Sequence, residues 1–185
     1  MDDATAAERR KTVSWRDPAP ALRASFGLSG LGYLEAMRDG RLPVPPAAAL
    51  IGIVVAEVEE GRVSMRLAPS EEHYNPLGSV HGGIIATLLD SVMGCAAHST
   101  LPARRGYTTL EIKVNYLRAV TVATGEVTAE GRVVHAGRRS AVAEARLTDA
   151  ARRLYATAST TCLFVDPPAG DALGASVAAG ASDRR

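Results

Sequence analysis

The chain is short of cysteine, lysine and aromatic residues. Its two cysteines, Cys95 and Cys162, have no paired spacing, and its histidines lack the spacing of metal ligands. Neither a disulfide framework nor a metal site is therefore indicated. With two phenylalanines and one tryptophan, an aromatic-lined pocket is not evident either. Because unpaired thiols suit a reducing compartment, we expect a cytoplasmic protein.

Long apolar runs and a strong excess of one charge are also missing. Residues 1–15 are charged and contain no apolar stretch, which argues against a signal peptide. The most apolar stretch, Val80–Leu101, is interrupted by Asp90, so it predicts a buried helix and not a membrane span. A net charge of +1 and a pI near 7.9 favour neither nucleic acid nor a membrane surface as a partner. There is no P-loop or dinucleotide fingerprint, and we expect no cofactor.

What the chain does contain is enough apolar sequence, 46% of its residues, for the core of one domain. We place that domain at residues 43–166. Residues 1–42 are predicted to be a partly helical N-terminal extension with an amphipathic segment at Leu28–Arg38, although its first 22 residues are polar and expected to be poorly ordered. Residues 167–185 are rich in proline, glycine, alanine and serine and predict a disordered tail.

One long helix among six strand-like segments predicts an α+β fold, a curved, mostly antiparallel six-stranded sheet wrapped around a central helix. The apolar residues of that helix cover more than half of its circumference, which indicates burial on more than one side. In the most regular strand, Leu110, Ile112, Val114 and Tyr116 are expected to share one face. The expected strands are Ile51–Glu57, Arg62–Leu67, Thr108–Tyr116, Glu126–Val134, Ser140–Thr148 and Leu154–Val165.

The segment from Asn75 to Asp90 carries the pattern that best suits chemistry. Gly82 and Gly83 open the long helix, where backbone N–H groups without intrahelical partners can bind an anionic or polarised oxygen. Asp90 is a single carboxylate on this apolar helix and is costly there unless it has a partner or a task. A purely structural role is the alternative for each residue: a solvent-facing helix edge for Asp90, a tight turn for the glycines, and a capping role for His81.

The spacing inside this segment predicts an oligomer. Gly82 and Asp90 are eight residues apart, so a helical rise of 1.5 Å per residue separates them by about 12 Å. An oxyanion donor and a base or nucleophile must both lie within about 3 Å of the reacting centre. Two antiparallel copies related by a twofold axis can meet this condition, with Gly82 of one copy facing Asp90 of the other.

Asn75, the sequence His81-Gly82-Gly83, Asp90 and the strand that follows resemble the hotdog-fold acyl-CoA thioesterases of the phenylacetic-acid-degradation type. The resemblance covers about residues 45–165. It implies a thioester hydrolase that converts an acyl-CoA into a carboxylic acid and free coenzyme A. It also implies a homodimer at least and, by pairing of dimers, a homotetramer.

The resemblance assigns roles at the reacting carbonyl. Asp90 matches the acid that attacks the thioester or activates water, and the N–H of Gly82 matches the oxyanion-hole donor. Asn75 and His81 match positions that orient the carbonyl or the water. Thr109 matches a hydroxyl that helps to hold the water near the acid, with Thr108 as the alternative register.

The resemblance also assigns substrate-binding residues. Gly83 belongs to the helix start, and the segment from His135 to Ser140 resembles a hairpin whose basic residues meet the phosphates of coenzyme A. Arg138, Arg139 and Ser140 are the residues concerned, and arginine suits phosphate through its bidentate fork. An exposed charged turn without such a role is the alternative for either arginine.

Other activities are less well supported. A non-catalytic acyl-CoA-binding or sensing protein on the same fold would have little use for Asp90. A hydratase or dehydratase would require a histidine and an acid placed along the acyl chain, and His81 sits in a sequence that matches the thioesterases better. The acyl group remains open among small, medium-chain, aryl and hydroxyaryl groups.

Overall fold

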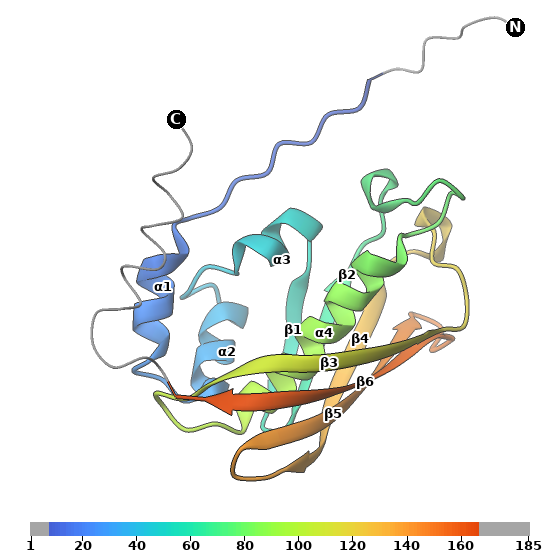
Figure 1. Ribbon diagram of the computed structural model, residues 1–185. Coiled ribbons are helices and arrows are strands. Elements are labelled where there is room, and N and C mark those ends of the chain that lie inside the picture. Colours follow the sequence, from blue (N-terminus) through green and yellow to red (C-terminus); the bar gives the residue numbers. More distant parts are fainter. Residues whose placement is uncertain (1–7, 167–185) are drawn as a thin grey trace, which may run out of the picture.

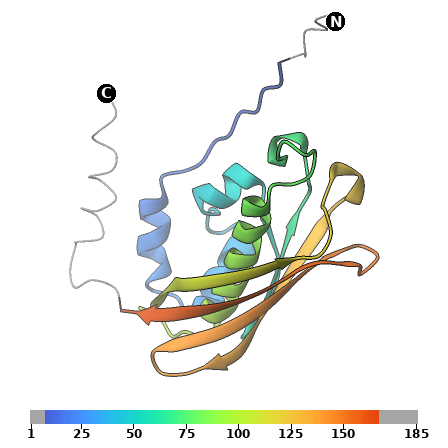
Figure 2. The same ribbon diagram turned by 45° about the vertical axis from the view of Figure 1, so that its right-hand side comes forward.

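The computed structural model describes residues 8–166, in which six strands form a single sheet that curves around the helix α4, Gly82–Ser99 (Figure 1). The strand order is β1-β2-β4-β5-β6-β3, and every neighbouring pair is antiparallel. Figure 2 shows the sheet from a second side, with the strands bending round the helix. The predicted α+β architecture is confirmed. The strands are β1 (Val54–Glu59), β2 (Arg62–Leu67), β3 (Gly106–Tyr116), β4 (Val127–Ala136), β5 (Ser140–Asp149) and β6 (Leu154–Val165).

The core lies between α4 and the concave face of the sheet, as the wide apolar arc of this helix predicts. Leu88, Leu89, Val92 and Met93 are fully buried there. Close contact with the sheet depends on Gly131 in β4, because a Cβ at this position would lie 2.7 Å from the carbonyl oxygen of Val92. The helix is therefore held at a fixed depth and rotation against the sheet.

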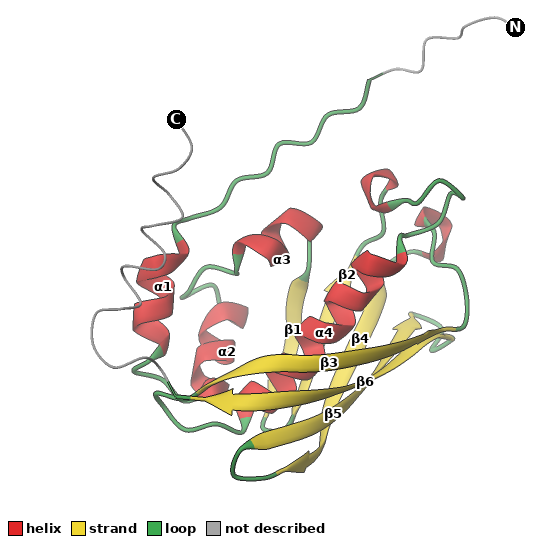
Figure 3. Ribbon diagram, in the orientation of Figure 1, coloured by secondary structure: helices red, strands yellow, loops and turns green. Residues whose placement is uncertain are grey.

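Three short helices precede the sheet: α1 (Pro18–Ser25), α2 (Gly30–Arg38) and α3 (Pro46–Ile51) (Figure 3). The expectation of poor order through residue 22 is wrong from Pro18 onward. Asp17 caps α1 by accepting a hydrogen bond from Ala19 N–H at 2.9 Å, and proline at the first helical position suits a helix start. The amphipathic segment is confirmed as α2, which buries Leu34 and Met37 in the core.

The predicted first strand begins three residues too early. Ile51 ends α3, and Gly52 follows it with a left-handed φ of 86°, the usual stop for a helix. The domain division at residue 42 stays a prediction. The predicted tail, residues 167–185, lies outside the described residues.

The face prediction for β3 is wrong for Leu110, which is 59% exposed. Tyr116 is 52% exposed but shares the face of Ile112 and Val114, since its Oη donates to the Gly82 carbonyl on α4. The pairing of β3 with β6 shifts register between Thr109 and Glu111, so Leu110 forms a β-bulge. An extra residue in one strand reverses which side chains face the core. Before the bulge, the odd-numbered Thr109 faces α4. After the bulge, the even-numbered Ile112 faces α4.

Of the helices in the described part of the chain, none combines the length and the apolarity needed to cross a membrane.

Candidate active site

The turn that leads into α4 is stabilised by Asn75. Its side-chain Oδ1 accepts hydrogen bonds from the N–H groups of Leu77 at 2.9 Å and Ser79 at 3.3 Å, while its Nδ2 donates to Ser79 Oγ at 3.1 Å. The backbone closes the same turn through Asn75 N–H and Ser79 O at 2.8 Å. Asn75 thus shapes the entrance to the helix in this structure.

His81 is the N-cap of α4. Its Nδ1 accepts a hydrogen bond from Gly83 N–H at 2.9 Å, and this bond places the ring proton of the neutral imidazole on Nε2. The imidazole is exposed, so the Nε2–H group is available as a donor. The capping interpretation of His81 is correct as far as Nδ1 is concerned, and it leaves the second nitrogen free for a substrate.

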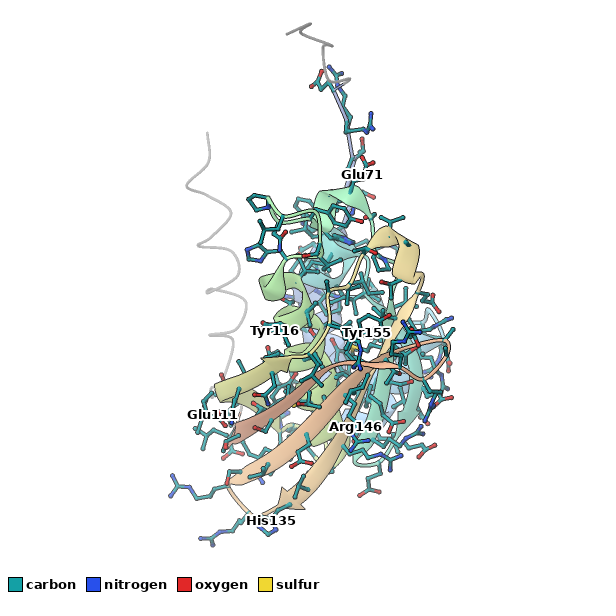
Figure 4. All side chains as sticks on the ribbon, turned by 90° about the vertical axis from the view of Figure 1, so that its right-hand side faces the viewer. Glu71, Glu111, Tyr116, His135, Arg146 and Tyr155 are labelled. Carbon is teal, nitrogen blue, oxygen red and sulfur yellow. The ribbon has the colours of Figure 1, made fainter. Side chains whose placement is uncertain are left out.

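The N–H of Gly82 has no acceptor among residues 8–166. Its carbonyl oxygen accepts a hydrogen bond from Tyr116 Oη at 2.9 Å, and a Cβ on Gly82 would lie 3.3 Å from the Tyr116 ring. Figure 4 shows Tyr116 beside this end of α4. Glycine thus allows β3 to fix the helix start, with one backbone N–H left for a ligand.

Asp90 lies two turns further along α4 and is half-buried. Thr109 Oγ1 donates to its Oδ1 at 2.9 Å, and the bulge at Leu110 is what turns Thr109 toward the helix. Thr108, the alternative register, is exposed. The structure therefore brings Asp90 and Thr109 together, and Oδ2 of the carboxylate has no protein donor among the described residues.

The hairpin between β4 and β5 exposes both Arg138 and Arg139, with Ser140 at the start of β5. The carbonyl of Arg138 accepts hydrogen bonds from the guanidinium of Arg105 at 3.2 and 3.3 Å, which links the hairpin to the loop before β3. In Figure 4 this hairpin, marked by His135, lies at the end of the molecule opposite to the start of α4. Within one chain the hairpin therefore lies far from Gly82.

The sequence reasoning missed a cluster of aromatic rings beside this site. Tyr33 from α2, His98 from α4 and Tyr107 from β3 lie together, with ring centroids 5.6 Å apart for each neighbouring pair. They line a cavity of about 390 Å³ that Phe26 also borders. The low aromatic content hid this cluster, since the rings come from four separate segments and no local pattern joins them.

The cysteines are not suited to nucleophilic chemistry. Burial raises the pKa of Cys95 to about 12, with a smaller effect from the Asp90 charge, and burial also raises the pKa of Cys162. A thiol with so high a pKa forms little thiolate at neutral pH. Among residues 8–166, no group of three His, Cys, Asp or Glu side chains could hold a metal ion.

Residues 77–156 match the family model of the thioesterase superfamily. A conserved protein of Pseudomonas aeruginosa with a known structure is 35% identical, with a TM-score of 0.63 over 66% of this chain and 95% of that chain. A phenylacetic acid degradation-related protein of Ralstonia eutropha JMP134 is 28% identical, with a TM-score of 0.65 over 71% of this chain and 98% of that chain.

Curated relatives give the same result. The 1,4-dihydroxy-2-naphthoyl-CoA hydrolase of Listeria monocytogenes is 29% identical over 111 residues, which are 60% of this chain and 89% of that protein. A relative from Halobacterium salinarum is 35% identical over 101 residues, and the chain spans 65% of that protein's length. These matches confirm the predicted resemblance and, at the level of the family, the predicted enzyme class: the chain belongs to the thioesterase superfamily and has its hotdog fold.

Proposed function

We propose that this protein hydrolyses acyl-CoA thioesters at a site shared by two chains. The observation that carries the proposal is the hydrogen bond of 2.9 Å between Thr109 Oγ1 and Asp90 Oδ1. It orients the carboxylate and leaves Oδ2 to accept a proton from water or to attack the thioester carbonyl itself. Either role needs a donor for the oxyanion that forms on the carbonyl oxygen.

The N–H of Gly82 fits the role of that donor, but it belongs to a second copy. The helical rise puts Gly82 about 12 Å from Asp90 in one chain, which is too far for both to meet at one carbonyl. In an antiparallel pair of α4 helices, Gly82 of the partner subunit would face Asp90. Its N–H would stabilise the tetrahedral intermediate. With Asp90 as the base, this intermediate collapses to the carboxylic acid, and the proton that Asp90 took from water passes to the leaving thiolate of coenzyme A. With Asp90 as the nucleophile, the thiolate leaves an acyl-Asp90 anhydride, which water then hydrolyses to the acid.

The free edge of the sheet supports such a pair. β3 is the last strand of the sheet, and an edge strand offers unpaired backbone groups to another chain. Large apolar side chains are exposed on β3, just after it and in the turn before α4: Leu110 is 59% exposed, Tyr116 52%, Leu117 51% and Leu77 91%. Exposed apolar patches of this kind are typical of interfaces. Pairing of such dimers into a tetramer is part of the same proposal.

The proposed substrates are coenzyme A thioesters of small, aryl or medium-chain acids. The Listeria relative bears the name of an aryl-CoA hydrolase. In an antiparallel dimer, the exposed Arg138 and Arg139 of one chain would lie near the helix start of the other, where they could bind the phosphates of coenzyme A. The same proposal places the protein in the cytoplasm, where such thioesters are formed.

The variant Asp90→Asn tests the assignment. We expect it to fold and assemble like the wild type but to release coenzyme A at least about a hundredfold more slowly, because an amide can neither accept the proton nor attack. Thiol release from several acyl-CoAs in a coupled colour assay measures the effect. Glu111→Gln, which neutralises an exposed carboxylate on the same strand as Thr109, is the matched control. Near-wild-type turnover by Asp90→Asn would rule out the proposed role.

A further inference from the structure

The aromatic cavity lies between α1, α2, the second half of α4 and the loop that leads into β3. Its volume of about 390 Å³ is at the lower end of the roughly 300–1,000 Å³ typical of small-molecule sites. The wall is mainly apolar and aromatic. Its apolar and aromatic residues include Leu22, Phe26, Tyr33, Met37, Cys95 and Tyr107.

The cavity begins one helical turn beyond the proposed catalytic carboxylate. Thr109, which holds Asp90, and Tyr107 are alternate residues of β3 and face the same helix. Tyr107 packs directly on Gly94, where any added Cβ would overlap its ring, and Gly94 is one turn after Asp90. Cys95, in the cavity wall, is about 7.5 Å along the helix from Asp90. A group attached to a carbonyl at Asp90 would enter this space past the Tyr107 ring.

The three polar rings in the wall are uncharged. Burial lowers the pKa of His98 and raises the pKa of both Tyr33 and Tyr107, so all three rings are neutral near pH 7. The charged residues of the wall are Arg104, Arg105 and Asp166. The guanidinium of Arg105 pairs with Asp166 at 3.3 Å, donates to the Arg138 carbonyl and lies 5.6 Å from the centre of the Phe164 ring. The part of the space that the neutral rings line favours a flat apolar or hydroxylated group.

The outer wall of this cavity comes from α1, a part of the N-terminal extension. Leu22 and Phe26 are half-buried against the cavity, and no residue of α1 is fully buried. The helix therefore contributes little to the main core, and its contact with the rest of the molecule is largely the cavity itself. Removing this helix would open the cavity to solvent without cutting into the sheet or α4.

We propose that the cavity binds the acyl group of the thioester and that α1 closes it, so that Leu22 and Phe26 set a preference for a bulky aryl acyl group. This inference rests on the proposed function and adds a role for the N-terminal extension. An acyl group as small as acetyl does not reach past Tyr107 and does not use the cavity.

The test compares two tryptophan substitutions on α1. Leu22→Trp adds a large side chain inside the cavity, whereas Ala24→Trp adds the same side chain on the exposed face of the helix. We expect Leu22→Trp to lower kcat/KM for 2-naphthoyl-CoA at least about tenfold and to leave acetyl-CoA hydrolysis within about twofold of the wild type. Ala24→Trp should leave both rates unchanged.

A second measurement separates this inference from the proposed function. Binding of free 2-naphthoate to the wild type and to both variants is measured by calorimetry, without any catalytic step. We expect binding that Leu22→Trp abolishes and Ala24→Trp retains, even in a protein that hydrolyses no thioester. Equal losses of aryl and acetyl hydrolysis in Leu22→Trp would overturn the inference, as would equal effects of the two substitutions or naphthoate binding that Leu22→Trp leaves intact.

Discussion

At the residue scale, each of three groups in the proposed site is held in place through one atom and leaves another without a protein partner among residues 8–166. His81 uses Nδ1 to cap α4 and keeps Nε2 exposed, and Gly82 offers its carbonyl to Tyr116 and keeps its N–H free. Asp90 is oriented through one carboxylate oxygen while the second has no protein donor among residues 8–166. In the proposed mechanism, each group would thereby be held in place before a substrate arrives, which would lower the cost of ordering it during the reaction.

His98 links the aromatic cavity to the pH dependence of stability. Burial keeps its pKa below the ordinary value of 6.5, although a backbone hydrogen bond at Arg105 partly opposes this shift. As the pH falls below 6.5, the unfolded chain takes up a proton that the folded chain refuses, so the free energy of unfolding decreases. We expect His98→Phe, which keeps a ring between Tyr33 and Tyr107, to show a weaker decrease than the wild type between about pH 7.5 and 5.

Urea unfolding of both proteins at several pH values measures this difference. Both proteins contain the same carboxylates, so the effect of these groups on stability cancels in the comparison. Their lowered pKa values, such as about 2 for Glu72, also affect stability only at more acidic pH. Identical pH slopes for the two proteins would show that His98 does not contribute.

At the element scale, the site depends on how closely α4 approaches β4 and β3. Gly131 lets the β4 backbone touch the α4 backbone at Val92, and Gly94 lets Tyr107 of β3 lie flat on the helix. Small residues at both contacts fix the rotation of α4 about its axis. That rotation turns Asp90 toward Thr109, and the bulge at Leu110 turns Thr109 toward Asp90.

Gly131→Ala should therefore destabilise the fold. The new methyl group would meet backbone atoms of α4 at 2.7 Å, and backbone cannot give way as a flexible side chain can. We expect a loss of about 2 kcal/mol or more in the free energy of unfolding, measured by urea denaturation. Gly137→Ala is the control, because its methyl group would find ordinary contacts at 3.5 Å in an exposed turn. Equal stability of the two variants would contradict the proposed close packing.

At the scale of the whole molecule, the start of α4 and the arginine hairpin lie far apart within one chain. Gly82 lies at one end of the molecule, whereas the arginine hairpin lies at the opposite end and is linked through Arg105 to the strand that carries Thr109. In the proposed antiparallel dimer, each helix start would meet the other chain's carboxylate and hairpin. The sheet edge at β3 is where the two copies can meet.

Complementation tests this arrangement with the variants Asp90→Asn and Gly82→Pro. Proline removes the N–H of Gly82 and suits the first helical position, and the φ of −58° and ψ of 135° at His81 allow a proline to follow. Gly82→Ala keeps the N–H and is the matched control for the added carbon. Each proline or asparagine variant alone should lose at least about a hundredfold in kcat.

Co-expressed in equal amounts, the two inactive chains should recover about a quarter of wild-type activity. Half of the dimers are then hybrids, and one of the two sites in each hybrid has both intact groups. Chains that carry different tags allow the hybrid dimers to be purified and their thiol release to be measured directly. The background rate is that of the two variants expressed and assembled separately and then mixed. Hybrids that stay inactive would place the whole site within one chain.

Much of the fold could be predicted, because it depends on local patterns that each segment carries by itself. The wide apolar arc of α4, the strand alternation and the turns before β5 and β6 lie within windows of ten to twenty residues. Predictions failed where one residue changed the local geometry: the left-handed Gly52, the N-cap Asp17 and the bulge at Leu110. Such features follow from backbone geometry and not from the hydrophobic pattern.

By itself, the sequence determined the family and the central helix. It also determined which residues between Asn75 and Asp90 are candidates for the site, since these residues lie close together in the chain and form one recognisable pattern. Only the tertiary structure decided that Thr109 and not Thr108 meets Asp90, and that rings from four segments enclose one cavity. The physical reason is the same in both cases. Contacts between distant segments depend on register and packing, which emerge when the sheet closes around α4.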